Sequence, residues 1–413
     1  MRVRRPTRRR RPSQRKGRSR LGTTAVFLFD VGPAQALPGF DEDYHFSLLP
    51  FWGNYCLADF LIATFGFADD TEVTLVLEEA ARDTSLALSS RWKKPVARVH
   101  ALEGGLAGIV RLIEGVRADR VVLASTSCVF LIDPAHLRER IQETADHVVK
   151  LSVGRTPVEV YLSRPAYLAR LLASAAEHDT GRKGLREALF DGILHDAIDL
   201  LVDVPGEILF QNDLMEYYTN NIWVVANCES QRFHAALSRL PELADKGAES
   251  HIAERGNIRN SWLASGVEVE GTVEDSILFP NVLVRRNALV SRAVVLNGNR
   301  IGSGTEIQSA LILPFTAEVP RPMPNIGDNC TIGARTSTMK NSDYPLHIRN
   351  GIAVVGMNAD IPNGFKAEAA TFIAPGVPAN VLKRIKVLHR GGSVLGNPTA
   401  ARRGGGNGSG EMA

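Results

Sequence analysis

The chain has 413 residues, of which 44% are hydrophobic and 23% charged, a composition ordinary for a globular protein long enough to hold two domains. Its four cysteines are widely scattered and form no metal-ligand spacing, so a reducing, cytoplasmic setting is expected. The net charge of +3 hides an uneven distribution, because residues 1–20 carry 11 positive charges and no acid. Subtracting 11 from +3 leaves −8 on the rest of the chain.

Both ends of the chain have compositions that disfavour packing. Residues 1–21 form a basic arm that we expect to be disordered, and it lacks the aromatic residues that stack on bases, so nucleic-acid binding is not expected. The glycine-rich tail, residues 391–413, is also expected to be disordered. The longest apolar run, residues 57–68, is too short to span a bilayer and contains Asp59, so no membrane partner is predicted.

Apolar strand-like runs alternate with helical patterns through residues 22–235. This alternation predicts an α/β domain with a mostly parallel, doubly wound, Rossmann-like sheet. Ligands of such sheets bind outside the carboxyl ends of the strands, so these ends are the places to inspect. We expect strands at residues 24–31, 72–79, 120–125 and 157–163, and helices near residues 55–65, 105–116, 135–146 and 165–176.

A six-residue period sets the second half apart, after a linker at residues 236–255. A helix requires a period of 3.6 and a simple strand a period of 2, so neither explains it. The period predicts a left-handed parallel β-helix of hexapeptide repeats over residues 256–390, with Gly and Asn at its corners, rather than an antiparallel sandwich. Its inward-facing side chains are predicted to be Val267, Val273, Leu278, Val284, Val290, Val295 or Leu296, Ile301, Ile307, Leu313, Ile348, Val354, Ile361, Ala367 and Ile373.

Hexapeptide β-helices serve acyltransferases as well as oligomerisation. An acyltransferase needs a histidine that acts as general base in the groove between subunits. The candidates are His347, in the irregular segment 342–347, and His389. A lone loop histidine is more often solvated than catalytic, so we expect the β-helix to bind its own kind through stacked flat faces.

Several segments resemble the ADP-glucose pyrophosphorylases (glucose-1-phosphate adenylyltransferases), and they do so in the same order along the chain. The resemblance covers residues 22–313 and implies a nucleotidyltransferase domain followed by a β-helix. The segments that carry it are "LLPFWGNYCLADF" (48–60), "EGGLAGIVRLI" (103–113), "VVLASTSCVFLIDP" (121–134), "NDLMEYYTNNIWV" (212–224) and the stretch that begins "GNIRNSWLASG" (256–266).

The positions that bind phosphate and metal in that family carry other residues here. Residues 28–37 contain one glycine and no basic residue where the family has a glycine-rich phosphate loop. The family's two metal-binding aspartates fall on Ser127 and Phe210, which are poor Mg²⁺ ligands. The resemblance leaves a vestigial nucleotide site at Gly104, Gly105, Ala107 and Asp133. The glycines can equally terminate a strand, and Asp133 can cap a helix.

These departures predict a subunit with no catalytic residues, no metal and no cofactor. The resemblance then implies a regulatory subunit of glycogen (α-glucan) biosynthesis, which binds a catalytic ADP-glucose pyrophosphorylase subunit or itself through the β-helix and responds to a nucleotide or sugar-phosphate effector. The first alternative is an active enzyme that makes ADP-glucose from glucose 1-phosphate and ATP with Mg²⁺ and relocated ligands. The second is a hexapeptide acyltransferase. The acidic segment "DEDYH" (41–45), the one candidate for relocated ligands, is expected to be a solvated loop.

Overall fold

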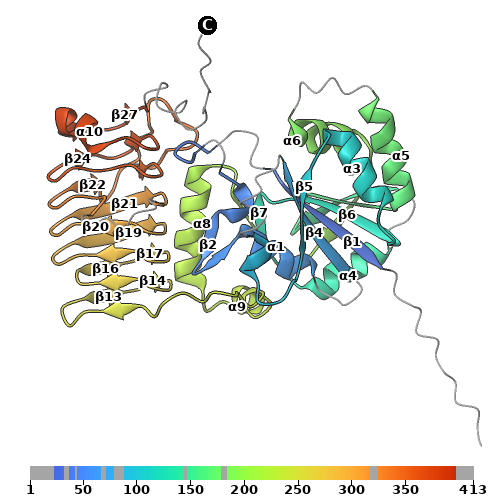
Figure 1. The fold of residues 1–413 in the computed structure, drawn as a ribbon, viewed down its shortest axis with the longest axis horizontal. Coiled ribbons are helices and arrows are strands. Elements are labelled where there is room, and N and C mark those ends of the chain that lie inside the picture. The colour runs from blue at the N-terminus through green and yellow to red at the C-terminus, as the bar shows by residue number, and fades with distance from the viewer. Residues whose placement is uncertain are drawn as a thin grey trace, which may run out of the picture.

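The computed structural model describes residues 23–31, 37–41, 44–66, 71–78, 88–143, 147–177, 184–316 and 324–396. Figure 1 shows an α/β part and a stack of flat coils, with helix α8 (Leu214–Asn227) between them. Three predictions fall outside the described residues. They concern the basic arm (residues 1–21), the core of the segment that stands where the family has its phosphate loop (residues 32–36), and most of the glycine-rich tail (residues 397–413).

Seven strands form the main sheet in the order β10-β8-β9-β6-β1-β4-β5. All but β9 run parallel to β1, so the mostly parallel sheet is confirmed. Because β4 and β6 flank β1, the chain order reverses beside β1, which makes that point the topological switch point of the sheet. The strands are β1 (Thr24–Asp30), β4 (Thr71–Glu78), β5 (Arg98–Leu102), β6 (Arg120–Ser125), β8 (Val148–Val153), β9 (Thr156–Ser163) and β10 (Ile198–Val204).

Helices cover both faces of this sheet. On one face, α3 (Gly105–Glu114) and α5 (Pro165–Ala176) pack on alternate side chains of β1 and β6. On the other, α1 (Leu57–Phe65) and α4 (Pro134–Glu143) pack on the intervening side chains. Burial on both faces explains why β1 is apolar at five consecutive positions, residues 25–29. The shorter helices are η1 (Phe46–Leu48), α6 (Leu185–Ala188), the π-helical η2 (Leu189–Ile193), α7 (Leu194–Asp196) and α9 (Gln231–Leu237).

Two short antiparallel ribbons extend this domain toward the β-helix. Strands β2 (Pro50–Trp52) and β3 (Tyr55–Cys56) form one, and β7 (Cys128–Ile132) pairs with β11 (Gly206–Phe210) in the other. The fully buried carboxylate of Asp59 accepts hydrogen bonds from Arg91 (2.6–3.0 Å), from the Trp92 ring nitrogen (2.8 Å) and from the Cys56 amide (2.8 Å). One side chain thus fixes β3, α1 and the segment after residue 88 together.

The second half is the expected stack of parallel coils, and every side chain predicted to face inward is buried. Matching residues of successive coils pair in parallel, as Val273, Val290 and Ile307 do. A short helix, α10 (Ala379–Ile385), lies in the last coils. The strands are β12 (His251–Ile252), β13 (Asn257–Arg259), β14 (Trp262–Leu263), β15 (Glu268–Val269), β16 (Thr272–Glu274), β17 (Ile277–Leu278), β18 (Leu283–Val284), β19 (Leu289–Val295), β20 (Arg300–Ile301), β21 (Glu306–Ile312), β22 (Thr331–Gly333), β23 (Ala353–Val355), β24 (Lys366–Ala367), β25 (Phe372–Ile373), β26 (Val387–Leu388) and β27 (Ser393–Val394).

One flat face of the β-helix is the internal interface of the chain. The runs at residues 293–296 and 310–313 are buried at every position, inward and outward alike, because α8 covers their outer side. The Tyr218 hydroxyl on α8 donates to the Arg292 carbonyl at 2.6 Å. This face is therefore covered within the chain, and stacking between copies through the β-helix would use the other faces.

The structure confirms the predicted corner residues of the β-helix and corrects its predicted C-terminal limit. Asparagines at the corners adopt left-handed backbone, which costs this side chain little, and examples are Asn281, Asn287 and Asn329 with φ of 62°, 58° and 54°. The expected disordered tail begins too early, because β27 pairs with β25 beyond residue 390. Val394 supplies the last inward-facing side chain there, a single valine among glycines that carries little periodic signal.

Candidate functional site

The carboxyl ends of β1 and β6 meet at the switch point. Asp30 ends β1, Ser125 ends β6, and the Thr126 amide continues the ladder by donating to the Phe29 carbonyl at 3.1 Å. Helix packing buries both strands, so their ends are held at fixed positions. Any ligand of this sheet would be expected at this edge.

A buried carboxylate that the sequence analysis did not single out lies at this edge. The Asp30 side chain is 1% exposed, and its two oxygens accept from His45 Nδ1 at 2.7 Å and from the Ser47 amide at 2.6 Å. His45 belongs to the "DEDYH" segment that was expected to be solvated, so that expectation is wrong for the histidine; residues 42–43 lie outside the described part. The sequence signal that could have found the pair is the polar Asp30 at the end of an apolar strand.

The two family metal positions come together in space. The β7–β11 pairing sets Phe210 opposite Cys128, and the Gln211 amide donates to the Ser127 carbonyl at 3.0 Å. Two segments more than 80 residues apart in sequence are therefore adjacent where the resemblance places them. Ser127 is 3% exposed, and its hydroxyl lies 2.8 Å from the hydroxyl of Ser125.

These residues do not fit Mg²⁺, which prefers carboxylate and water oxygens in octahedral array. Phe210 offers only a ring, the Ser127 hydroxyl is bound to Ser125, and both oxygens of Asp30 are already acceptors. Across the described ranges, no group of three His, Cys, Asp or Glu side chains could hold a metal ion. We derive no metal-dependent step from this site.

The next carboxylate along this edge is neutralised within the protein. Glu159 on β9 forms an ion pair with Arg186 on α6, and both side chains are about four-fifths buried. Burial, with the charge of Glu159 as a second cause, raises the pKa of the Cys128 thiol far above its usual range. Cys128 is therefore a neutral thiol and neither a nucleophile nor a metal ligand at neutral pH.

Hydrogen-bonding capacity remains at the strand ends. The side-chain oxygens of Ser47, Thr126 and Gln211 are buried and have no hydrogen-bond partner within the described ranges. Ser47 is tied to Asp30 and Gln211 to Ser127 through their backbone amides, so these oxygens belong to the same edge. The two hydroxyls can donate or accept a hydrogen bond and the Gln211 amide oxygen only accepts, but none of the three has the positive charge that attracts a phosphate.

The residues predicted to retain a nucleotide site lie at the β5–α3 turn on the same edge of the sheet. Gly104 and Gly105 both adopt left-handed backbone, with φ of 79° and 53°, and with Ala107 they are exposed. The turn is closed by Arg111, which donates to the Glu103 carbonyl at 3.0 Å. A shallow cavity of about 340 Å³ lies behind it, lined by His100, Ala101, Glu103, Gly108, Arg111 and Leu112.

Asp133 is not brought to the switch point. It follows the far end of β7, whereas the metal positions lie beside its first residue, Cys128. Its side chain is exposed and accepts from the Ala135 amide at 2.9 Å, the geometry of a helix cap on α4.

His347 differs from its expected environment. His347 was expected to be solvated but is only 7% exposed. Burial lowers the pKa of its imidazole; the negative charge of Asp213 raises that pKa and the positive charge of Arg349 lowers it further. Arg349 forms an ion pair with Asp213 at 2.8 Å, and Asp213 caps α8 through the Glu216 amide. His347 is therefore part of the contact between the β-helix and the α/β domain. The other acyltransferase candidate, His389, is exposed.

Comparison with known proteins identifies a family for the second half and several similar proteins. Residues 245–342 match the family described as "GlmU-like, C-terminal hexapeptide". The chain is 25% identical over 196 residues to the glucose-1-phosphate adenylyltransferase of Fervidobacterium nodosum, which covers 47% of this chain and 43% of that protein. It is 28% identical over 137 residues to the same enzyme of Acetivibrio thermocellus, with coverages of 33% and 30%.

A third relative has a different printed name. The chain is 23% identical over 207 residues to the bifunctional protein GlmU of Clostridium beijerinckii, covering 44% of this chain and 43% of that protein. The chain spans less than half the length of each of these three curated relatives. Nowhere in the described ranges is there a helix with the length and apolarity needed to cross a membrane. The chain is thus similar to glucose-1-phosphate adenylyltransferases, with a nucleotidyltransferase-like domain followed by a hexapeptide β-helix.

Proposed function

We propose that this protein is a non-catalytic, regulatory subunit of the glucose-1-phosphate adenylyltransferase type, acting with a catalytic subunit in cytoplasmic α-glucan synthesis. The observation that carries the proposal is the pair of adjacent strand ends at Ser127 and Phe210, where no metal-binding carboxylate remains. Regulation of the partner would require a coupling free energy of about 1–3 kcal/mol between the two subunits.

The chemistry of the reaction explains why neutral residues at positions 127 and 210 disfavour catalysis. Joining glucose 1-phosphate to ATP brings two anions together, and metal ions with positive side chains must neutralise the charge that develops. Loss of one preorganised electrostatic contact costs about 3–4 kcal/mol of barrier. Here both metal positions are neutral, and Asp30 is held by His45 and Ser47.

The docking surface for a catalytic partner is proposed at the C-terminal end of the β-helix. One flat face is closed by α8, whereas apolar side chains are exposed on α10 and at other positions of the last coils. Exposed apolar groups of this kind are typical of interaction surfaces. They are Met339 (40% exposed), Leu346 (64%), Val381 (40%), Ile385 (40%) and Leu395 (56%).

Turnover by the purified full chain tests the catalytic half of the proposal. The protein is incubated with glucose 1-phosphate, Mg²⁺ and either ATP or UTP, and pyrophosphate and nucleotide sugar are measured. We expect neither product. Formation of a nucleotide sugar would establish the active alternative, and loss of that activity in Asp30→Asn would locate the relocated ligand.

Association tests the other half. Light scattering of the protein mixed with the catalytic adenylyltransferase from the same cell should show a joint species, and Leu346→Asp with Val381→Asp should abolish it. Absence of a joint species would contradict the proposed partnership. The acyltransferase alternative predicts instead that acyl-CoA binds and that His347→Ala abolishes transfer, which the burial of His347 disfavours.

A further inference from the structure

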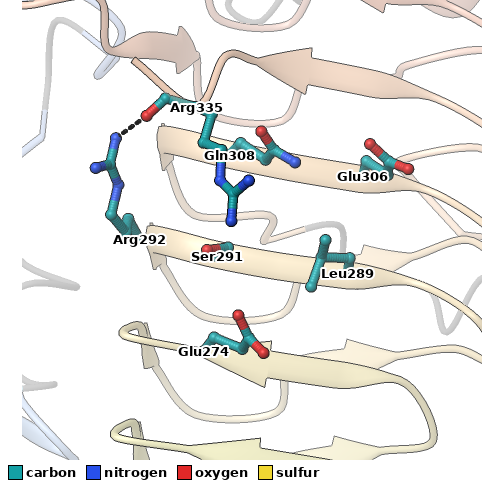
Figure 2. Close-up of a pocket in the computed structure, with 7 residues that line it drawn as sticks. All are labelled: Glu274, Leu289, Ser291, Arg292, Glu306, Gln308 and Arg335. Atoms are coloured by element: carbon teal, nitrogen blue, oxygen red, sulfur yellow. Dashed lines mark hydrogen bonds between the residues drawn. The ribbon is translucent and has the colours of Figure 1, made fainter.

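An open face of the β-helix contains a polar hollow of about 220 Å³ (Figure 2). Glu274, Ser291 and Gln308 form an outward column on successive coils, in parallel register. The column stops at Gly333, which pairs with Gln308 and has no side chain. Its φ is 81°, and a Cβ there would lie 1.9 Å from the Gln308 carbonyl oxygen, so the hollow is fixed by the backbone.

Arg335 forms the roof of this hollow. Its carbonyl accepts a hydrogen bond from Arg292, which also donates to the Ser309 hydroxyl at 2.5 Å. Figure 2 shows the Arg335 side chain extending over the strands toward Ser291 and Gln308, while Arg292 points to the Arg335 carbonyl. The backbone of the roof is therefore anchored, and its guanidinium is directed into the hollow.

Four side chains in the hollow have unused hydrogen-bonding capacity. Ser291, Glu306, Gln308 and Arg335 make no side-chain hydrogen bond or ion pair with each other or with any other residue in the described ranges. Together they offer a hydroxyl, a carboxylate, an amide and a guanidinium within one rigid surface. Adjacent coils separate these groups by about 4.8 Å, so one small ligand can contact several of them.

The charges select the chemical class of the ligand. Two glutamates and two arginines give the lining no net charge, so a phosphate gains no net attraction and meets two carboxylates. Leu289 is the one apolar side chain of the lining, which is too little for an apolar ligand or an apolar peptide side chain. The amide of Gln308, the carboxylate of Glu306 and the guanidinium of Arg335 are planar groups with paired hydrogen-bonding atoms. Such groups match the neighbouring hydroxyls of a sugar ring.

We propose that this hollow binds one ring of a neutral sugar, either free or at the end of a polysaccharide. The site is on the β-helix and separate from the switch point of the sheet, so the proposal goes beyond the regulatory function and does not depend on it. Affinity in the millimolar range is expected, since the site is open to water and small.

The test titrates the full-length protein, without any catalytic partner, with glucose, maltotriose and glucose 1-phosphate, followed by saturation-transfer NMR and calorimetry. Glucose and maltotriose are expected to bind saturably, and Gln308→Ala and Arg335→Ala to weaken them by about tenfold. Tighter binding of maltotriose would identify a polysaccharide end as the source, and equal binding a free sugar.

Lys366→Ala is the matched control, because Lys366 is exposed on the same face at β24 and does not line the hollow. It should bind like the unaltered protein. The side chains replaced in these variants, Gln308, Arg335 and Lys366, are partly or fully exposed, so the variants are expected to keep the fold. Circular dichroism checks that they do. Absence of saturable sugar binding, stronger binding of glucose 1-phosphate than of glucose, or equal loss in Lys366→Ala would each overturn the proposal.

Discussion

At the scale of single residues, a buried carboxylate with a structural role contrasts with the uncharged residues at the strand ends. Asp59, within the segment that resembles the adenylyltransferases, is fully buried and bound by three donor groups. Ser127 and Phe210, at the metal positions, keep the backbone pairing of the strand ends and lose the charge. Asp59 thus holds elements of the fold together, whereas Ser127 and Phe210 bring only neutral side chains to the strand ends.

Asp59→Asn should destabilise the protein by about 3–5 kcal/mol, because it leaves the guanidinium of Arg91 without its buried counter-charge. The free energy of unfolding is measured in urea. Glu72→Gln is the matched control, since it breaks an ion pair with Arg98 in which both side chains are more than three-fifths exposed, and should change that free energy by less than about 1 kcal/mol. Equal effects of the two substitutions would contradict the assigned role of Asp59.

His347 predicts a pH dependence of stability. Burial lowers its pKa in the folded state, so the unfolded chain binds the proton more readily. The contribution of His347 to the free energy of unfolding is therefore complete at a pH above the pKa of the unfolded chain, near 6.5. It is lost as the pH falls from that value toward the lower pKa of the folded state. His347→Gln should flatten the stability profile between about pH 7.5 and pH 5 relative to the unaltered protein, and His389→Gln, at an exposed histidine, should not.

At the scale of elements, the periodicity of the sequence predicted the repeated coils and the buried strands. It missed short elements and the strand at the edge of the sheet. The strands near residues 24–31 and 120–125 follow the predicted ranges closely, because two-sided burial makes them continuous and apolar. The helix at 165–176 does so because Pro165 begins it and one face, with Leu168 and Leu172, is buried. The edge strand β10 was missed because Leu200 and Leu201 are about half exposed. They lie between Asp199 and Asp203, which accept hydrogen bonds from the neighbouring strand β8. Nor does any periodic signal mark α8 as the element between the two halves.

The Arg349–Asp213 ion pair tests the contact between elements. Asp213→Asn keeps an acceptor for the α8 cap and removes the charge, whereas Arg349→Ala removes the partner. A double-mutant cycle on the free energy of unfolding should give a coupling of about 0.5–1.5 kcal/mol, since both side chains are at least two-thirds buried. The exposed Lys93–Glu242 pair serves as the comparison and should give a smaller coupling. A coupling of zero for Arg349 and Asp213 would show that this pair does not tie the halves together.

At the scale of the whole molecule, the sequence predicted the two architectures. Resemblance placed Ser127 and Phe210 together, and the β7–β11 ribbon joins them. The Asp30–His45 pair and the hollow beneath Arg335 were not predicted, because each joins residues that are 15 or more positions apart through a turn or a coil. Such contacts follow from coil length and insertions, which periodicity alone does not specify.

The most direct test of the central claim is the initial rate of pyrophosphate formation from ATP and glucose 1-phosphate with Mg²⁺, measured for this protein alone, for the catalytic adenylyltransferase from the same cell, and for their mixture. The regulatory account predicts no turnover by this protein alone and a mixture whose rate or effector response differs from that of the catalytic enzyme. Turnover by the isolated chain, or a mixture that behaves as the catalytic enzyme alone, would contradict it.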